Sequence, residues 1–473
     1  MIPLTAQEAA AALGVDRVPR AVTGVSIDSR TIREGDLFVA LAGDRFDGHA
    51  FVAAAFAAGA SAAVVRRGAP LDDASRRVAE GFVIEVDDTL AALSGLARAV
   101  RRQARTRVIG ITGSVGKTST KDLLRAAASG VASVVATQAN ENNEIGVPLT
   151  LLKIEAETGV AVVEMGMRGR GQILSLARTA EPDVGLITRI APVHLELVGD
   201  LAGVAASKSE LFRGLRPGGT AVIPAPEPLL EEQVEKIGVP AVRFAFCRES
   251  SASVEAEVWG RALAVDGPQA RLEVVWPKGH AEVEVPYSAP YRLENAIAAI
   301  AACFAAGLPV PGCVAALAAV RFTPLRGDEY VLGDLLLLDD SYNANPAAVI
   351  VAVEDLVRRA RHSRGRPVAV LGDMLELGPE ALEYHRSVGK RAAQAGVSLL
   401  IAVGPLSAAT IEGFEMARSA RADVERASLH LPDLDDGLEV ILSSLRTGDV
   451  VLVKGSRGMR LERVVEAIRK SAA

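Results

Sequence analysis

The chain has 473 residues, which is too long for one hydrophobic core and, at roughly 150 residues per domain, predicts about three domains. Hydrophobic residues make up 49% and charged residues 23%, which excludes global disorder, and the net charge of −6 argues against nonspecific nucleic-acid binding. The first residues lack a basic segment followed by an apolar core, so we expect no signal peptide and a cytoplasmic protein.

The longest apolar stretch, residues 296–320, is interrupted by two glycines and two prolines, which predicts two buried helices and no membrane span. The three cysteines have no zinc-ligand spacing, as expected of reduced thiols in a cytosolic protein. Only nine of the 52 basic residues are lysines. A lysine within a motif is therefore expected to be there for its primary amine, which arginine cannot supply.

Residues 1–86 are predicted to form a small α/β domain. Short strand patterns at 24–27 and 37–41 precede an alanine-rich helix and a further strand at 62–65.

Residues 87–322 are predicted to form a central domain with a largely parallel sheet. Its buried strands are separated by helical segments, and residues 253–288 alternate as antiparallel strands do. We expect strands at 107–112, 159–163, 184–188 and 220–223, and helices at 89–102, 119–128 and 293–306.

Residues 323–473 are predicted to form a third α/β unit, since prolines and glycines at 323–327 mark a boundary. Strands are expected at 335–339, 368–371, 399–403 and 450–453, with helices between them. This is the pattern of a doubly wound, Rossmann-like domain.

The strongest chemical signal is a glycine-rich loop between the strand at 107–112 and the following helix. Backbone N–H groups of such a loop surround phosphate oxygens, while Lys117 reaches the β and γ oxygens and Thr118 offers its hydroxyl to magnesium. A standard P-loop has glycine at the position of Ile111, and the alternative is a glycine-rich turn with one surface lysine. The nucleotide-binding candidates are Thr112, Gly113, Ser114, Val115, Gly116, Lys117, Thr118 and Ser119.

Three further side chains are candidates for catalysis or metal binding. Glu164 ends a buried strand, where a carboxylate can hold magnesium. His194 follows the strand at 184–188, and Lys208 lies in a helical segment. Taken singly, each has an ordinary alternative: a solvated carboxylate, a capped turn histidine and a surface lysine.

Together these residues resemble the Mur ligase family over essentially the whole chain. The likeness is carried by the shortened loop T-G-S-x-G-K-T and by residues 142–150, 164–166, 194–196, 339–346 and 454–458. It implies three domains: residues 1–86 for a UDP-sugar peptide, 87–322 for ATP and 323–473 for the incoming amino compound.

Within the family, the motifs are most similar to ligases that join D-alanyl-D-alanine to UDP-N-acetylmuramoyl-tripeptide. The resemblance implies an amide ligase of cell-wall precursor synthesis that uses ATP and two Mg²⁺ ions and passes through an acyl phosphate. The expected partners are these two small molecules, with no nucleic acid and no integral membrane contact, and the expected state is a monomer. The third residue of the tripeptide stays open.

The resemblance also assigns roles in the reaction. Lys117 would bind the triphosphate, Thr118 and Glu164 the first magnesium, and His194 the second, while Lys208 would carry carbon dioxide as a carbamate and so become a metal ligand. Nucleotide contacts would come from Asn295 at adenine, Arg326 at the phosphates and Asp340 at ribose. Two departures weaken the assignments of Arg326 and Asn295: P-G-R is P-L-R here, and H-N-x-x-N is replaced at residues 291–295.

The remaining implied contacts are with the substrates. Residues 28–30 and 43–49 look like UDP-substrate loops, and turns with an aspartate cap are the alternative. Arg457 would meet the free carboxylate of the dipeptide. The substrate candidates are Ser29, Arg30, Asp47, Gly48, His49, Asn142, Asn143, Asn343, Asn345, Lys454, Ser456 and Arg457.

Two alternatives remain at the level of sequence. The preceding ligase of the same pathway adds the third amino acid, but its D-N-P-R motif is absent. A P-loop NTPase switch would fit the loop alone, but no N-K-x-D or ordinary Walker arrangement accompanies it.

Overall fold

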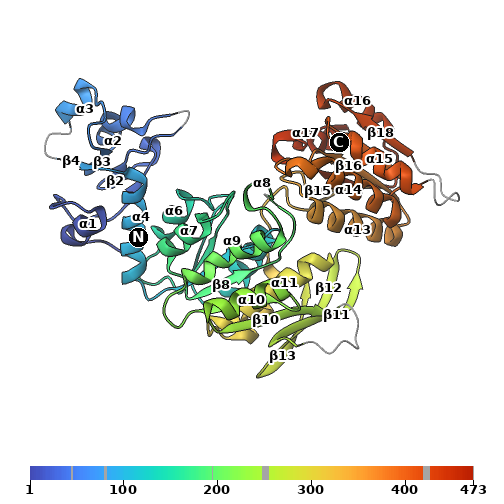
Figure 1. The fold of residues 1–473 in the computed structure, drawn as a ribbon, viewed down its shortest axis with the longest axis horizontal. Helices are drawn as coiled ribbons and strands as arrows, with labels where there is room; N and C mark the ends of the chain where they lie inside the picture. The colour runs from blue at the N-terminus through green and yellow to red at the C-terminus, as the bar shows by residue number, and fades with distance from the viewer. Residues whose placement is uncertain (44–45, 79–81, 194, 248–254, 419–426, 472–473) are drawn as a thin grey trace.

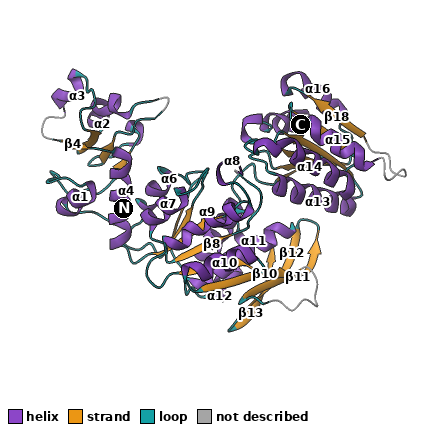
Figure 2. Ribbon diagram, viewed as in Figure 1, coloured by secondary structure: helices purple, strands orange, loops and turns teal. Residues whose placement is uncertain are grey.

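The computed structural model describes residues 1–43, 46–78, 82–193, 195–247, 255–418 and 427–471, and three sheets follow one another along this part of the chain (Figure 1). Helices accompany each sheet (Figure 2), so the expected α/β class is confirmed. None of the described helices is both long enough and apolar enough to cross a lipid bilayer.

The first sheet has four parallel strands in the order β1-β2-β3-β4. Its first helix begins at a capping box, in which Thr5 and Glu8 each accept a backbone N–H of the other. The described elements are α1 (Ala6–Leu13), β1 (Val25–Ser26), β2 (Leu37–Val39), α2 (Val52–Ala57), β3 (Ala62–Arg66), α3 (Asp73–Val78) and β4 (Val83–Val86), with short 3-10 turns at Ser29–Thr31 and Gly48–Phe51.

The second sheet has the order β13-β12-β11-β10-β9-β8-β5-β7-β6. Its strands are β5 (Arg107–Thr112), β6 (Val134–Ala136), β7 (Val160–Glu164), β8 (Val184–Ile187), β9 (Thr220–Pro224), β10 (Ala241–Cys247), β11 (Val258–Asp266), β12 (Gln269–Trp276) and β13 (Gly279–Val285). The pairs from β11 to β6 are parallel, whereas β12 and β13 add antiparallel pairs, as the alternation at 253–288 predicts for its described part.

Helices cover both faces of this sheet. One hydrophobic cluster lies under α5 (Lys117–Ser129), α11 (Pro290–Ala305) and α12 (Val310–Ala316). The other lies under α6 (Gly146–Leu151), α7 (Gln172–Ala180), α9 (Leu201–Arg213) and α10 (Pro228–Ile237), with the short α8 (Leu195–Val198) preceding α9. Strands β6 and β10 have no counterpart among the predicted strands, because β6 is three half-buried residues at the sheet edge and Arg243 interrupts the apolar run of β10.

Helix α4 (Thr89–Gln103) joins the first unit to the central one. Asp88 caps it by accepting two backbone N–H groups. The helix packs against α1 on one side and against α6 and α7 on the other, within a single hydrophobic cluster. At the contact with α1, a Cβ on Gly95 would lie 2.2 Å from the carbonyl oxygen of Ala12, so this close approach requires glycine.

The third sheet has the order β14-β15-β19-β16-β17-β18, with only β14 antiparallel among these strands. Helices α13 (Pro346–Ser363), α14 (Ala381–Ala395) and α15 (Ala408–Arg418) cover one face, and α16 (Leu434–Ser444) and α17 (Glu462–Ser471) cover the other. The strands are β14 (Asp328–Leu332), β15 (Leu335–Asp339), β16 (Arg366–Gly372), β17 (Leu399–Val403), β18 (Ala427–Leu431) and β19 (Asp449–Lys454). The doubly wound arrangement is confirmed, and the unpredicted strands β14 and β18 are half-buried edges without a strong apolar run.

Candidate active site

A cavity of about 860 Å³ lies between the central and C-terminal units, beside the carboxyl ends of β5, β7, β15 and β19. This is the usual position for ligands of parallel α/β sheets. The predicted residues that line it are Ser114, Val115, Gly116, Lys117, Thr118, Ser119, Asn142, Asn143, Glu164, Lys208, Asn295, Arg326, Asp340, Asn343, Asn345, Lys454, Ser456 and Arg457. His194, the predicted ligand of the second magnesium, lies outside the described residues.

The phosphate-loop candidate wraps the first turn of α5. Gly116 has φ 87°, and α5 begins at the next residue, two positions before the predicted start. A Cβ on Gly113 would lie 2.0 Å from Thr188 Oγ1, so the loop is pressed against the end of β8. Ser114 Oγ donates to the carbonyl of Ala191 at 2.9 Å, so the segment after β8 also holds the next residue of the loop.

Two lysines lie at this loop, Lys117 half-buried and Lys208 buried. Lys117 Nζ donates to the carbonyl of Gly113 at 2.7 Å, and burial lowers the Lys117 pKa, with Glu164 opposing the shift and Arg326 adding to it. Lys208, on α9, is 2% exposed, and burial together with the charge of Lys117 lowers its pKa well below the ordinary value. A neutral amine is a nucleophile, whereas an ammonium is not.

Glu164, at the end of β7, meets Thr118, in the first turn of α5. Glu164 Oε1 accepts hydrogen bonds from Asn142 Nδ2 at 2.8 Å and Thr118 Oγ1 at 3.3 Å. The other carboxylate oxygen, Oε2, is buried without a hydrogen-bond partner among the described residues. A buried carboxylate oxygen with free lone pairs beside a threonine hydroxyl is a donor set suited to Mg²⁺.

The first turns of α11 close one side of the loop. A Cβ on Gly116 would lie 2.8 Å from Asn295 Oδ1, so the predicted adenine contact packs directly on the phosphate loop. Its neighbour Glu294 accepts from Arg189 Nη2 at 2.6 and 2.5 Å. This ion pair cannot be predicted from the sequence, because Arg189 belongs to no motif and only the fold brings it to α11.

Tyr342 is a second feature that the sequence did not reveal. Its ring centroid lies 4.0 Å from the guanidinium carbon of Arg326 and 5.6 Å from that of Arg457. One aromatic ring therefore holds the predicted phosphate arginine and the predicted dipeptide arginine by cation–π contacts. Tyr342 belongs to the motif at 339–346, but nothing in its spacing indicates this contact.

The remaining C-terminal candidates form ion pairs or hydrogen bonds with other residues of the chain. Lys454 Nζ is 2.6 Å from Asp340 Oδ2 and also donates to the Asn343 carbonyl at 2.8 Å. Asn345 Oδ1 accepts the Ala348 N–H at 2.9 Å as the cap of α13. Ser456 Oγ accepts the N–H of Leu375 at 2.9 Å, which places the loop at 373–377 on the cavity wall.

The first-unit candidates do not line the cavity. Arg30, in the turn that begins at Ser29, forms an ion pair with Asp28 at 2.6 Å, and hydrogen bonds from Arg30 lower the Asp28 pKa to about 2. His49 is buried, its Nδ1 lies 2.5 Å from Asp47 Oδ1, and its Nε2 accepts the Arg66 N–H at 2.9 Å. A Cβ on Gly48 would lie 2.8 Å from the backbone of Leu41, so this loop is tightly packed.

A phosphate loop that faces a Rossmann-like domain across a cavity defines a multidomain nucleotide-dependent enzyme. Three family models match in chain order: the Mur ligase family catalytic domain at 21–101, the Mur ligase middle domain at 111–303 and the Mur ligase glutamate ligase domain at 321–457. The chain belongs to the Mur ligase family.

Full-length relatives agree with this assignment. The UDP-N-acetylmuramoyl-tripeptide--D-alanyl-D-alanine ligase of Bacillus subtilis is 33% identical over 95% of this chain and 94% of its own length. The ligase of the same name from Escherichia coli is 34% identical over 94% of each chain.

Solved structures extend the likeness to the whole fold. MurF from Acinetobacter baumannii superposes with a TM-score of 0.85 at 28% identity, covering 99% of both chains. MurF from Thermotoga maritima in complex with ADP gives a TM-score of 0.79 at 26% identity, covering 95% of this chain and 97% of that one.

Proposed function

We propose that this Mur ligase joins D-alanyl-D-alanine to UDP-N-acetylmuramoyl-tripeptide and converts ATP to ADP and phosphate in the process. The observation that carries the proposal is the cavity wall, where the phosphate loop, Glu164 and Lys208 meet the C-terminal unit. The curated relatives of this name, matched over 94–95% of the chain, support the same reaction. ATP is a cytoplasmic nucleotide, and we place the reaction in the cytoplasm, carried out by a monomer.

The first step activates a carboxylate, which is a poor electrophile. An oxygen of the tripeptide's terminal carboxylate attacks the γ-phosphorus, the bond from phosphorus to the β,γ-bridging oxygen breaks, and ADP leaves an acyl phosphate behind. Lys117 and Arg326 stand on the cavity wall as cations for the crowded phosphate oxygens. The N–H groups of the loop lie at the N-terminus of α5, where the positive end of the helix dipole also attracts the phosphates.

The second step forms the amide. The amine of D-alanyl-D-alanine attacks the acyl carbonyl, and the tetrahedral intermediate collapses by expelling phosphate while the amine loses its proton. Arg457 and Asn343 are exposed at the C-terminal side of the cavity, where they suit a free carboxylate and a peptide backbone. Water would destroy the acyl phosphate, so we expect the C-terminal unit to close on the central one during turnover.

Magnesium fits the donors present. Thr118 and the unpartnered Oε2 of Glu164 would hold a first ion, with His194 assigned to a second by family motif. When bound, Mg²⁺ neutralises phosphate charge and orients the triphosphate.

Lys208 suits a carbamate. Its amine is buried and its pKa is lowered, so the neutral form can attack carbon dioxide, form an N–C bond and release a proton. The product is an anion, which offsets the neighbouring charge of Lys117 and supplies oxygen ligands for magnesium. Only a primary amine offers this chemistry among the basic side chains.

The UDP group of the tripeptide substrate and the dipeptide would bind to different units, and their reacting ends would meet at the cavity. Ser29, Arg30 and the loop with Asp47, Gly48 and His49 would face the UDP group, and Asn142 and Asn143 would contact the peptide near the phosphate loop. Lys454 and Ser456 would shape the dipeptide site through the loops that they hold.

The test is a matrix of UDP-N-acetylmuramoyl tripeptides ending in lysine, diaminopimelate or ornithine against several dipeptides. Phosphate release and product mass are measured together. We expect ADP, phosphate and a pentapeptide product only when tripeptide and D-alanyl-D-alanine are both present. ADP release that ignores both substrates would instead indicate a nucleotide switch, and product from a dipeptide precursor and a free amino acid would indicate the preceding ligase.

A further inference from the structure

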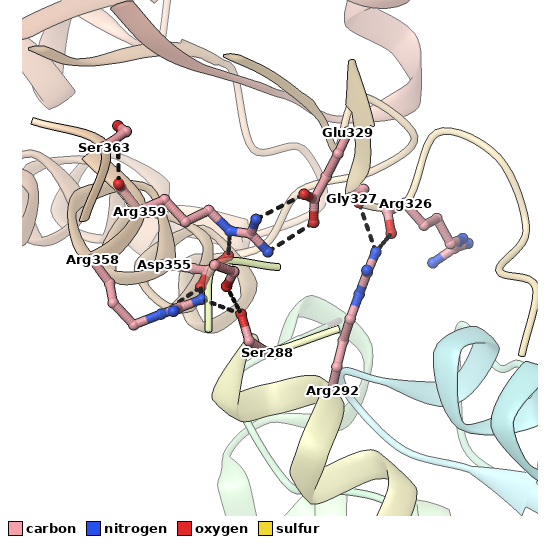
Figure 3. Close-up of polar contacts among 10 residues, drawn as sticks. Ser288, Arg292, Arg326, Gly327, Glu329, Asp355, Arg358, Arg359 and Ser363 are labelled. Atoms are coloured by element: carbon pink, nitrogen blue, oxygen red, sulfur yellow. Dashed lines mark hydrogen bonds and ion pairs between the residues drawn. The ribbon is translucent and has the colours of Figure 1, made fainter. Parts of the chain in front are cut away.

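Arg292 is a buried cation for which the proposed reaction has no role. It lies in the first turn of α11, where residues 291–295 replace the H-N-x-x-N sequence, and it is 5% exposed. Its Nη2 donates to the carbonyl oxygens of Arg326 at 3.0 Å and Gly327 at 2.7 Å (Figure 3). A guanidinium that donates to two successive carbonyls constrains the backbone that carries them.

That backbone is the linker, residues 321–327, which joins the central sheet to the C-terminal sheet. The guanidinium carbon of Arg292 also lies 4.2 Å from the ring centroid of Phe322, so Arg292 touches the linker near its start and at its end. Gly327 permits this contact, since it has φ 81° and a Cβ there would lie 2.8 Å from Arg292 Nη2.

Arg326 belongs to the linker, and its side chain lines the cavity. The first half of the linker is tied to α5, because Asp122 accepts the Thr323 N–H at 2.7 Å and the Thr323 hydroxyl at 3.2 Å. Its second half is held by Arg292, and Figure 3 shows the Arg326 side chain pointing away from the Arg292 guanidinium. The Arg326 side chain then stacks on Tyr342 at the cavity wall. Small shifts of the linker would therefore move this cation relative to a bound triphosphate.

We propose that Arg292 is a positioning residue that places Arg326 for the ATP phosphates by holding the Arg326 and Gly327 carbonyls. The proposal rests on the proposed function only in that Arg326 binds nucleotide phosphate. The proposal also explains why Arg292 stands where the H-N-x-x-N sequence has asparagine, because the longer arginine side chain reaches from α11 to the linker.

A second polar contact between the two units provides a matched control. Arg358 Nη2, on α13, donates to Ser288 Oγ at 3.2 Å (Figure 3). Ser288 precedes α11 and also donates to the Gly267 carbonyl at 2.7 Å. The contact between Arg358 and Ser288 joins the units without involving the linker, so Ser288→Ala should leave nucleotide binding within about twofold of wild type.

The experiment measures binding of magnesium β,γ-imido-ATP to the full chain by calorimetry, which does not require ligase turnover. The proteins are wild type, Arg292→Met, Arg292→Lys, Arg326→Ala, Arg292→Met/Arg326→Ala and Ser288→Ala. Methionine keeps the length of the stem but removes the donors. We expect Arg292→Met to weaken binding about tenfold in wild type and less than about twofold in the Arg326→Ala background.

Arg292→Lys should recover part of the affinity, since an ammonium can still donate to a carbonyl. Equal losses in both backgrounds, or unchanged affinity in Arg292→Met, would overturn the proposal. Thermal unfolding of every variant separates a folding defect from a binding defect. If Arg292→Met does not fold, Arg292→Lys is compared in the wild-type and Arg326→Ala backgrounds in its place. Ligase assays on the wild-type protein test the proposed function separately. A failure of the proposed function can therefore be distinguished from a failure of the Arg292 proposal.

Discussion

Lys454 and Asp340 form an ion pair with 2.6 Å between Nζ and Oδ2, joining the ends of the adjacent parallel strands β19 and β15. The lysine side chain is 3% exposed and the aspartate side chain 22% exposed, so water reaches only one partner well. The sequence motifs assign these residues to different ligands, Lys454 to the dipeptide and Asp340 to ribose. In the structure each is the other's electrostatic partner at the cavity wall.

This pair predicts unequal effects of removing either partner. Asp340→Ala leaves the buried Lys454 ammonium with the Asn343 carbonyl as its one remaining partner among the described residues, and we expect a loss of about 3 kcal/mol in the free energy of unfolding. Lys454→Met leaves a carboxylate that water can partly solvate, so about 1 kcal/mol is expected. Urea unfolding measures both, with the double variant as the third corner of the cycle. Equal losses would contradict the burial argument.

Lys208 should be needed for turnover but not for folding. We expect Lys208→Ala to lower kcat at least about 100-fold, since even outer partners of metal sites are worth 10- to 100-fold, and high bicarbonate should not restore it. Removing a buried amine removes a desolvation cost, so the melting temperature should be unchanged or higher. Lys236→Ala, on an exposed helix surface, is the control. Near-normal activity of Lys208→Ala would refute the carbamate assignment.

Glu164 should determine the magnesium requirement. The amide of Glu164→Gln can still accept from Asn142 and Thr118 but cannot supply an anionic oxygen. We expect the Mg²⁺ concentration for half-maximal phosphate release to rise at least about tenfold. Unfolding without magnesium should be unchanged, whereas stabilisation by added Mg²⁺ with nucleotide should decrease. An unaltered Mg²⁺ titration would rule out this ligand.

His385 should make the C-terminal unit sensitive to acid. It is fully buried, and its Nε2 accepts the Met374 N–H at 3.0 Å, a contact that needs the neutral ring, while its Nδ1 donates to the Ala381 carbonyl at 2.7 Å. Burial lowers the His385 pKa below 6.5, with the Ala381 carbonyl and Asp373 opposing the shift.

Because the folded pKa is the lower one, the unfolded chain binds more protons as the pH falls through 6.5. The stability contributed by neutral His385 is therefore complete above that pH and is lost below it. Urea unfolding between pH 7.5 and pH 5 measures this loss. We expect His385→Gln to show a smaller decrease over that interval than wild type, whereas parallel curves would show that other groups cause the acid sensitivity.

Much of the fold could be predicted from the sequence because its signals are local. Strands such as Leu335–Asp339 and Leu399–Val403 are continuous apolar runs bounded by turns, and they were predicted with the observed bounds. Edge strands cannot be predicted in this way because they lack a local signal. Asp328–Leu332, for example, is a half-buried antiparallel edge strand without a continuous apolar run. Helix α5 begins two residues early because Gly116 adopts a left-handed conformation, which the helical pattern alone does not encode.

The sequence by itself determined the chemistry that a short segment can carry: a phosphate loop that ends at Lys117 and Thr118, and a carboxylate at the end of a buried strand. Only the tertiary structure decided which charges face one another. Three contacts join residues from separate elements. They are the burial of Lys208 beside Lys117, the ion pair of Lys454 with Asp340 and the hydrogen bonds of Arg292 to the linker. Such contacts depend on how sheets and helices pack, and this packing cannot be predicted from the spacing of residues along one segment.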